Sequence, residues 1–310
     1  MKEQEQQKKK EALAGVILAI LAALIWSGNY IVARGFHRDI TPVSLAFFRW
    51  LTATVVLTPF AYASLRKQWP LLKASWLYLL IAALFGVSLF NTFIYVGGHT
   101  TSATNLAIIG TTAAPVFVLF IAHFFTREKA TVFQLAGTLL CIVGILLLIS
   151  KGDLARLRQF RFQPGDLWVL LAALSFAIYT VLVRKKPKEL APLSFLFATF
   201  FLGTLLLLPA FLIDSAKGLT FQWSPSLVAV FLYLGIGASV ISFLCWNTAI
   251  QKIGPSRTAL FGNLIPVFST IEAVVFLKEE SGAIAILSLL LIFCGLFLAN
   301  IKRLKKQKPL

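Results

Sequence analysis

The sequence contains an internal repeat, because its first two apolar segments recur 150 residues later without a gap. The matching positions are Gly15, Leu21 to Leu24, Arg34, Pro42, Ser44, Phe47, Thr54, Leu57 and Pro59, against Gly165, Leu171 to Leu174, Arg184, Pro192, Ser194, Phe197, Thr204, Leu207 and Pro209. At an offset of 151 the match continues, and Pro115, Val116 and Phe117 recur as Pro266, Val267 and Phe268. The chain therefore consists of two copies of one structural unit, residues 1–150 and 151–310.

The composition indicates that lipid surrounds most of this chain. Hydrophobic residues make up 58% and charged residues 13% of the 310 positions, whereas a soluble domain has about 45–50% and about 25%. Apolar stretches long enough to cross a bilayer, which takes roughly 17 to 25 residues, must form helices because unpaired backbone groups are too costly in hydrocarbon. We expect ten such spans, near residues 12–33, 42–65, 74–97, 102–125, 131–149, 166–184, 190–213, 225–250, 256–277 and 282–301.

The positions of the basic residues predict how the spans are oriented. The net charge of +17 comes from Lys and Arg that lie mostly in loops, which removes the need for a nucleic-acid partner. With the N-terminus in the cytoplasm, 20 of the 29 basic residues fall on the cytoplasmic side and 8 on the other. This bias predicts a multi-pass protein of the cell (inner or plasma) membrane with both termini cytoplasmic. The main exception is the basic linker at 150–165.

Five spans per repeat is an odd number, so the second copy enters the membrane from the opposite side. The predicted fold is therefore an all-α integral membrane protein, with ten transmembrane helices arranged as two inverted five-helix repeats that form one transport domain. Inverted repeats supply two equivalent gates, which is typical of carriers with an inward-open and an outward-open state.

Several motifs resemble the EamA family of the drug/metabolite transporter superfamily. They are the run Phe47-Phe48-Arg49 in the second span, and a Pro-Val-Phe followed by an acid, Glu128 or Glu279, in both halves. The resemblance extends from about residue 14 to 301. It implies an exporter-like carrier of small metabolites, often amino acids, with a central cavity lined by helices one, three, four, six, eight and nine.

Polar residues inside the spans are candidates for the substrate cavity, because they need a partner or a wet surface. Aromatic walls with a few amide groups suit a small amphipathic molecule. The other interpretation is that they are interfacial aromatics and hydrogen bonds between helices. The candidates are Trp26, Asn29, Tyr30, Phe90, Asn91, Tyr95, Tyr179, Phe243, Trp246, Asn247 and Asn263.

Two charged residues inside spans, Arg49 and Glu272, are candidates for gating or coupling. Their positions place them at similar depth, since a helix rises roughly 1.5 Å per residue. They could form a pair that opens with the cavity, and Glu272 could couple transport to protons. The alternatives are a fixed ion pair or an arginine that reaches the headgroups. Glu272 has Ile121 as its counterpart in the first repeat, so its role is not shared.

Pro115 and Pro266 occupy equivalent positions within their spans, and each removes an N–H donor. We expect this to free the carbonyls of Thr111 and Gly262. The kinks either supply ligand contacts and a bending point or only shape the packing.

The remaining residues exclude most other classes of function. An enzyme would need paired acids, a nucleophile with a base, or a metal cluster, and we expect no catalytic activity, cofactor or metal. Three cysteines in apolar runs provide no disulfide framework. The favoured function is a secondary carrier of a neutral or zwitterionic metabolite, with an aromatic or hydrophobic amino acid as the first candidate substrate. A channel, a membrane scaffold, and amine, drug-like or sugar-related substrates stay open. Gly137, Gly144 and Gly295 allow close helix contact, through which a homodimer could form.

Overall fold

The computed structural model describes residues 2–36, 40–101, 103–126, 130–153, 155, 161–216, 223–277 and 282–300, and these ranges are almost entirely helical. The elements of the first repeat are α1 (Lys2–Phe36), α2 (Pro42–Ala74), α3 (Trp76–Ala83), η1 (Leu84–Leu89), α4 (Phe90–Thr100), α5 (Ala103–Phe125) and α6 (Val132–Ser150). Those of the second are α8 (Pro164–Arg184), α9 (Pro192–Ala216), α10 (Pro225–Leu232), η2 (Tyr233–Ile241), α11 (Ser242–Ile253), α12 (Pro255–Phe261), α13 (Leu264–Leu277) and α14 (Ala283–Asn300).

Nine of the described helical segments are long and apolar enough to cross a membrane. They correspond to nine of the ten expected spans. The remaining span, 256–277, was expected to be one helix, but it consists of α12 and α13 with a turn at Gly262 and Asn263 between them. Pro266 contributes to the break, because it removes the backbone donor that would serve the carbonyl of Gly262, and that carbonyl accepts from Ile265 in the turn.

Helices α2 and α9 pack against each other in opposite directions. Ser44 in the first turn of α2 donates a hydrogen bond to Asp214 in the last turn of α9, over 3.1 Å. Further along α2, Ser64 lies 2.6 Å from Ser194 in the first turn of α9. Ser194 is the repeat counterpart of Ser44, and Asp214 is the repeat counterpart of Ser64, in each case 150 residues later. The operation that maps one repeat onto the other therefore maps one of these contacts onto the other.

The midpoint of this interface is Thr54, whose hydroxyl oxygen lies 3.3 Å from that of Thr204, 150 residues later. A residue that contacts its own repeat counterpart lies close to the two-fold axis that relates the repeats. Here that axis passes between two antiparallel helices, α2 and α9. The two repeats are therefore inverted, as the odd number of spans predicts.

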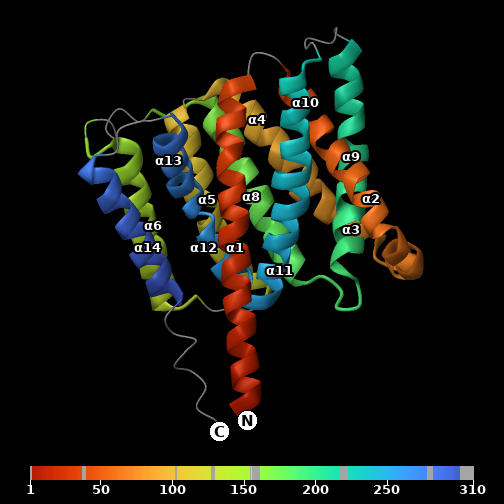
Figure 1. Cartoon of the computed structure of the whole chain (residues 1–310), viewed down its shortest axis with the longest axis horizontal. Helices are drawn as coiled ribbons and strands as arrows, with labels where there is room; N and C mark the ends of the chain where they lie inside the picture. Colours follow the sequence, from red (N-terminus) through yellow and green to blue (C-terminus); the bar gives the residue numbers. More distant parts are fainter. Residues whose placement is uncertain are drawn as a thin grey trace.

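Helices α6 and α14 form the second antiparallel pair, at the edge of the bundle opposite α2 and α9 (Figure 1). A Cβ added to Gly137 would lie 2.4 Å from the carbonyl oxygen of Gly295, and one added to Gly144 would lie 3.0 Å from that of Ser288. The expected close contact of glycines is thus confirmed, but it joins two helices of the same chain. A homodimer would have to use other surfaces.

The third helical segment of each repeat contains a stretch of wider, π-helical turns, η1 and η2. Such turns are often found at functional sites. Each contains a glycine against which a side chain from another helix lies. The ring of Tyr179 occupies the space beside Gly86, and Thr52 that beside Gly235.

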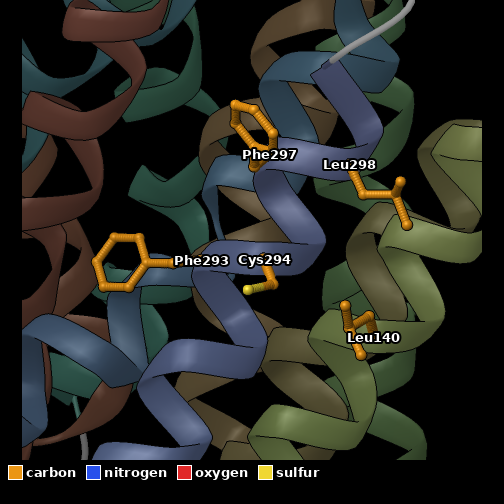
Figure 2. A pocket seen from close by; sticks show the side chains of 5 residues that line it. All are labelled: Leu140, Phe293, Cys294, Phe297 and Leu298. Carbon is orange, nitrogen blue, oxygen red and sulfur yellow. The ribbon is translucent and has the colours of Figure 1, made fainter.

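The outer surface is covered with large apolar side chains, such as Phe120 (66% exposed) and Phe297 (71% exposed), as lipid contact requires. One shallow apolar groove of about 460 Å³ lies between α6 and α14, as Figure 2 shows. It is lined by Leu140, Phe293, Cys294, Phe297 and Leu298. Its walls are apolar apart from the thiol of Cys294. The first turns of α1 and the last turns of α14 lie on the same side of the bundle (Figure 1).

Candidate functional site

An aromatic cluster fills the centre of the molecule, where α1, α2, α8, α9 and α11 meet. Trp26 contacts Phe176 with ring centroids 5.7 Å apart, and Trp50 contacts Phe200 at 4.8 Å. Each pair is separated by one repeat of 150 residues. The cluster thus lies along the same two-fold axis as Thr54 and Thr204. Phe243 links both pairs, at 5.7 Å from Trp26 and 5.2 Å from Trp50.

Five of the residues expected to line the cavity belong to this cluster, although their role in binding is a proposal. They are Trp26, Phe90, Tyr179, Phe243 and Trp246. The sequence interpretation missed Trp50, Phe176 and Phe200. The repeat itself contained the missing signal, because positions 176 and 200 are the counterparts of Trp26 and Trp50 and both are aromatic.

The intramembrane amides differ in their partners. Asn247 accepts from the Tyr179 hydroxyl and its amide nitrogen lies 2.7 Å from the same oxygen. Asn91 donates to the carbonyl of Val87 one turn earlier, over 3.3 Å, which is a bond within its own helical segment. The Asn263 amide is 1% exposed and has no hydrogen-bond partner, although it lies near the Cys141 thiol. The side chains of Asn29 and Tyr30 lie outside the described part of the structure.

Arg49 is a buried cation whose partners are all neutral. Only 2% of it is exposed. Its Nε donates to the Ser239 hydroxyl over 2.9 Å, Nη2 to the Ala238 carbonyl over 3.0 Å, and Nη1 to the Tyr95 hydroxyl over 3.3 Å. The guanidinium therefore joins α2 to η2 and α4. The carbonyl of Ala238 also accepts from the Trp26 indole over 2.8 Å, which brings α1 into the same network.

Glu272 lies on α13 with one oxygen against α1. Its Oε1 is 2.6 Å from the Ser27 hydroxyl, while Oε2 is buried and has no hydrogen-bond partner. The Ser27 hydroxyl lies 2.5 Å from the carbonyl oxygen of Leu24 as well.

The structure does not pair Arg49 with Glu272, which corrects one of the arrangements considered from the sequence. Each has its own partners, and Tyr233 on η2 lies within electrostatic reach of both charges. Tyr233 donates to the carbonyl of Ile25, two residues before Ser27 on α1. Similar depth in the membrane thus did not imply contact, because each charge has polar partners of its own.

The two prolines act differently in the two repeats. Helix α5 continues through Pro115, whereas the helix breaks before Pro266. The carbonyl of Gly262, which was expected to be free, accepts from the N–H of Ile265 over 3.0 Å. A tight turn has therefore taken over the acceptor that the proline released.

Several buried polar groups of the described residues have no hydrogen-bond partner. Among them are the indole nitrogens of Trp50 and Trp246, which belong to the aromatic cluster, and the amide of Asn263 beside Cys141. Unpaired buried donors cost roughly 1–3 kcal/mol each, so groups that a ligand can satisfy are favoured at a binding site. The described residues contain no group of three His, Cys, Asp or Glu that could hold a metal ion. The arrangement offers aromatic faces, neutral donors and one cation.

Comparisons with known proteins agree with this architecture. The sequence model of the EamA-like transporter family matches residues 13–150 and 163–301. A crystal structure of a protein with 20% sequence identity superposes with a TM-score of 0.74, covering 94% of this chain and 98% of that one, which supports the fold.

Several similar proteins are named as transporters. One from Archaeoglobus fulgidus, an uncharacterized transporter, is 30% identical over 288 residues, which is 93% of this chain and 97% of the relative. The uncharacterized transporter YyaM of Bacillus subtilis is 28% identical, covering 83% and 84%. Protein PecM of Dickeya dadantii is 24% identical, covering 94% and 95%. The chain is thus a multi-pass membrane transporter that belongs to the EamA-like transporter family.

Proposed function

We propose that this transporter is a secondary carrier that exports a small neutral or zwitterionic metabolite by alternating access. An amino acid with an aromatic or hydrophobic side chain is the first candidate for the substrate. The observation that supports this most is the aromatic cluster on the two-fold axis, since its pairs Trp26 with Phe176 and Trp50 with Phe200 each join the two repeats. A ligand held at that point can be reached from either side by equivalent movements.

The charges near the cluster favour a zwitterion over a polyanion. Arg49 is the cation of the central network, and its partners Ser239, Ala238 and Tyr95 are neutral. One guanidinium can bind one carboxylate through two parallel hydrogen bonds, whereas phosphate-bearing substrates are usually held by several cations. The aromatic rings of Trp26, Trp50 and Trp246 would cover an apolar side chain.

In the observed arrangement the rings contact each other directly, so we infer an occluded conformation. Substrate entry would separate rings that belong to different repeats, such as Trp26 and Phe176. We propose that residues 1–150 and 151–310 act as one transport domain, with both termini cytoplasmic in the cell membrane. Export as the direction of transport rests on the family.

Flux into proteoliposomes tests the proposal. Purified protein is reconstituted and offered labelled tryptophan, phenylalanine, leucine, an aromatic amine and a sugar. The proposal predicts saturable uptake of at least one amino acid and counterflow, in which unlabelled solute inside accelerates entry of label. Uptake that rises linearly with concentration and shows no counterflow would indicate a channel. Uptake of the amine or sugar alone would contradict the proposed substrate.

A further inference from the structure

The turn between α12 and α13 leaves α13 without the side-chain hydrogen bond that usually caps a helix. Asn263 is the last residue before α13, which is the N-cap position. An asparagine there normally accepts from the backbone N–H of the second or third helical residue. Here the third residue is Pro266, which has no N–H, and the N–H of the second, Ile265, donates to the carbonyl of Gly262. The local sequence therefore leaves the Asn263 amide without its usual partner.

Asn263 finds no partner in the rest of the described structure either. Its side chain is 1% exposed, and both the oxygen and the nitrogen of the amide lack a hydrogen bond. The Cys141 thiol lies beside the amide, but sulfur is a weak acceptor, and this thiol donates to the Ile292 carbonyl over 3.5 Å. A buried amide without hydrogen bonds destabilises a fold, so its presence calls for a ligand that satisfies it.

The first repeat shows that the bundle does not require this arrangement. The counterpart of Asn263, 151 residues earlier, is Thr112, whose hydroxyl donates to the Ile108 carbonyl over 2.6 Å. Its helix, α5, continues through Pro115. A satisfied side chain in a continuous helix thus corresponds to an unsatisfied one at a helix break. This difference between the repeats indicates one site per chain, in the second repeat.

A second unsatisfied donor lies beside the turn. A Cβ placed on Gly262 would lie 3.9 Å from a ring carbon of Trp246, and the indole nitrogen of Trp246 is buried without a hydrogen-bond partner. The Trp246 ring contacts that of Trp26, with centroids 5.0 Å apart. The turn therefore borders the central aromatic cluster.

We propose that the turn between α12 and α13 binds the charged head group of an amino acid, a step that rests on the proposed function. The Asn263 amide has a donor edge and an acceptor edge. Its oxygen accepts from the ammonium group, and its nitrogen donates to the carboxylate. Helix α13 has 14 residues, and its N-terminal end carries a partial positive charge that favours the carboxylate. The substrate side chain extends from the turn past Trp246 into the aromatic cluster.

On this assignment the carboxylate lies at α13, and Arg49 keeps its neutral partners when the substrate binds. The three nitrogens of the guanidinium already donate to those partners. One of them, the Ala238 carbonyl, also accepts from the Trp26 indole. Arg49 is then a positioning residue, which holds the ring that Trp246 contacts.

Thermal unfolding without solute distinguishes a ligand site from a structural residue. Asn263→Leu replaces the amide by an apolar side chain of similar size, and the expected Tm equals or exceeds that of the wild type, because an unsatisfied buried amide has been removed. Loss of a working N-cap would lower the Tm instead. Asn263→Ala is the second variant, because alanine introduces no clash. The control is Thr112→Val. A fall in Tm in both Asn263 variants, larger than that in Thr112→Val, contradicts the proposal.

Counterflow in proteoliposomes tests the ligand. Labelled tryptophan competes with unlabelled tryptophan, with tryptamine, which lacks the carboxylate, and with N-acetyltryptophan, which lacks the ammonium group. If the wild type prefers another amino acid, that one and its two analogues are used. In Asn263→Leu and Asn263→Ala the KM should rise roughly tenfold or more, because hydrogen bonds to charged groups are lost. The preference for the amino acid over both analogues should shrink. Thr112→Val should retain the wild-type KM and preference.

The outcomes separate this inference from the proposed function. Wild-type KM and preference in both Asn263 variants would overturn the head-group site and leave the carrier function intact. Preference retained in these variants but lost in Arg49→Lys would assign the carboxylate to Arg49 and also overturn the proposal. Failure of the wild type to transport any amino acid would overturn the proposed function, and the head-group site with it.

Discussion

The sulfur of Cys141 lies 3.5 Å from the carbonyl oxygen of Ile292, its own repeat counterpart 151 residues later. Gly144 contacts Ile292, and its counterpart Gly295 contacts Cys141. The interface of α6 and α14 therefore repeats the relationship seen at Thr54 and Thr204, with a second point on the two-fold axis. The two interfaces fix the inverted arrangement at opposite edges of the bundle.

We expect Gly137→Ala to destabilise the contact between α6 and α14. The new Cβ would lie 2.4 Å from the Gly295 carbonyl oxygen, and backbone on both helices would have to move. Overpacking of this kind costs about 1–3 kcal/mol. The control is Gly98→Ala, since its Cβ would meet one atom at 3.8 Å. Thermal unfolding in detergent should give a lower Tm for Gly137→Ala alone. Equal Tm values would refute the close packing.

A rescue experiment tests the packing of α1 on η2. In Gly28→Ala the Cβ would lie 2.3 Å from the Tyr233 hydroxyl oxygen, and 3.1 Å from the ring carbon that carries it. We expect a lower Tm for Gly28→Ala, and partial recovery in the double variant with Tyr233→Phe, because the phenylalanine lacks the clashing oxygen. Additive losses in the double variant would mean that the two residues do not meet.

The period of 150 residues was sufficient to predict most of the architecture. Thr54 contacts its own repeat counterpart, and the contacts of Ser44 and Ser64 are images of each other, because a two-fold axis relates equivalent positions. The break between α12 and α13 was not predicted, since Pro115 in the equivalent position leaves α5 continuous. Whether a proline breaks a helix depends on neighbouring residues that can close a turn, as Gly262 does.

The candidate site was harder to predict than the fold. Position along the helices placed Arg49 and Glu272 at a similar depth, but it could not predict that Arg49 would bond to Ser239 and Glu272 to Ser27. Serine is a small and frequent residue type, so nothing in the sequence distinguished Ser27 and Ser239 from other serines. Their role follows from the buried charges beside them, which only the packing reveals.

Arg49→Lys should impair both stability and transport. A lysine cannot supply the guanidinium fork that serves Ser239, Ala238 and Tyr95 together. Each hydrogen bond to a charged group is worth about 1.5–3 kcal/mol. Arg66→Lys, on the exposed surface of the same helix, is the control and should leave Tm and tryptophan counterflow unchanged. Wild-type counterflow in Arg49→Lys would show that a single charge is enough.

Two tryptophans of the cluster should respond differently to replacement by phenylalanine. The Trp26 indole donates to the Ala238 carbonyl, so Trp26→Phe loses a hydrogen bond and should lower Tm. The Trp246 indole nitrogen has no partner. We therefore expect Trp246→Phe to lower the Tm less than Trp26→Phe does. We also expect Trp246→Phe to raise the KM for amino-acid uptake. A KM unchanged in Trp246→Phe would exclude its indole N–H from substrate binding.

The most direct test of the inverted repeat is a pattern of cysteine cross-links between α2 and α9. In protein with Cys141, Cys245 and Cys294 replaced by serine, cysteine pairs are introduced at Ser44 with Asp214 and at Ser64 with Ser194. After oxidation, cleavage in the linker between the repeats should leave the halves joined on a non-reducing gel for both pairs. The pairs Ser44 with Ser194 and Ser64 with Asp214 should stay separate. Cross-links in those last two pairs, and not in the first two, would show parallel repeats and contradict the account.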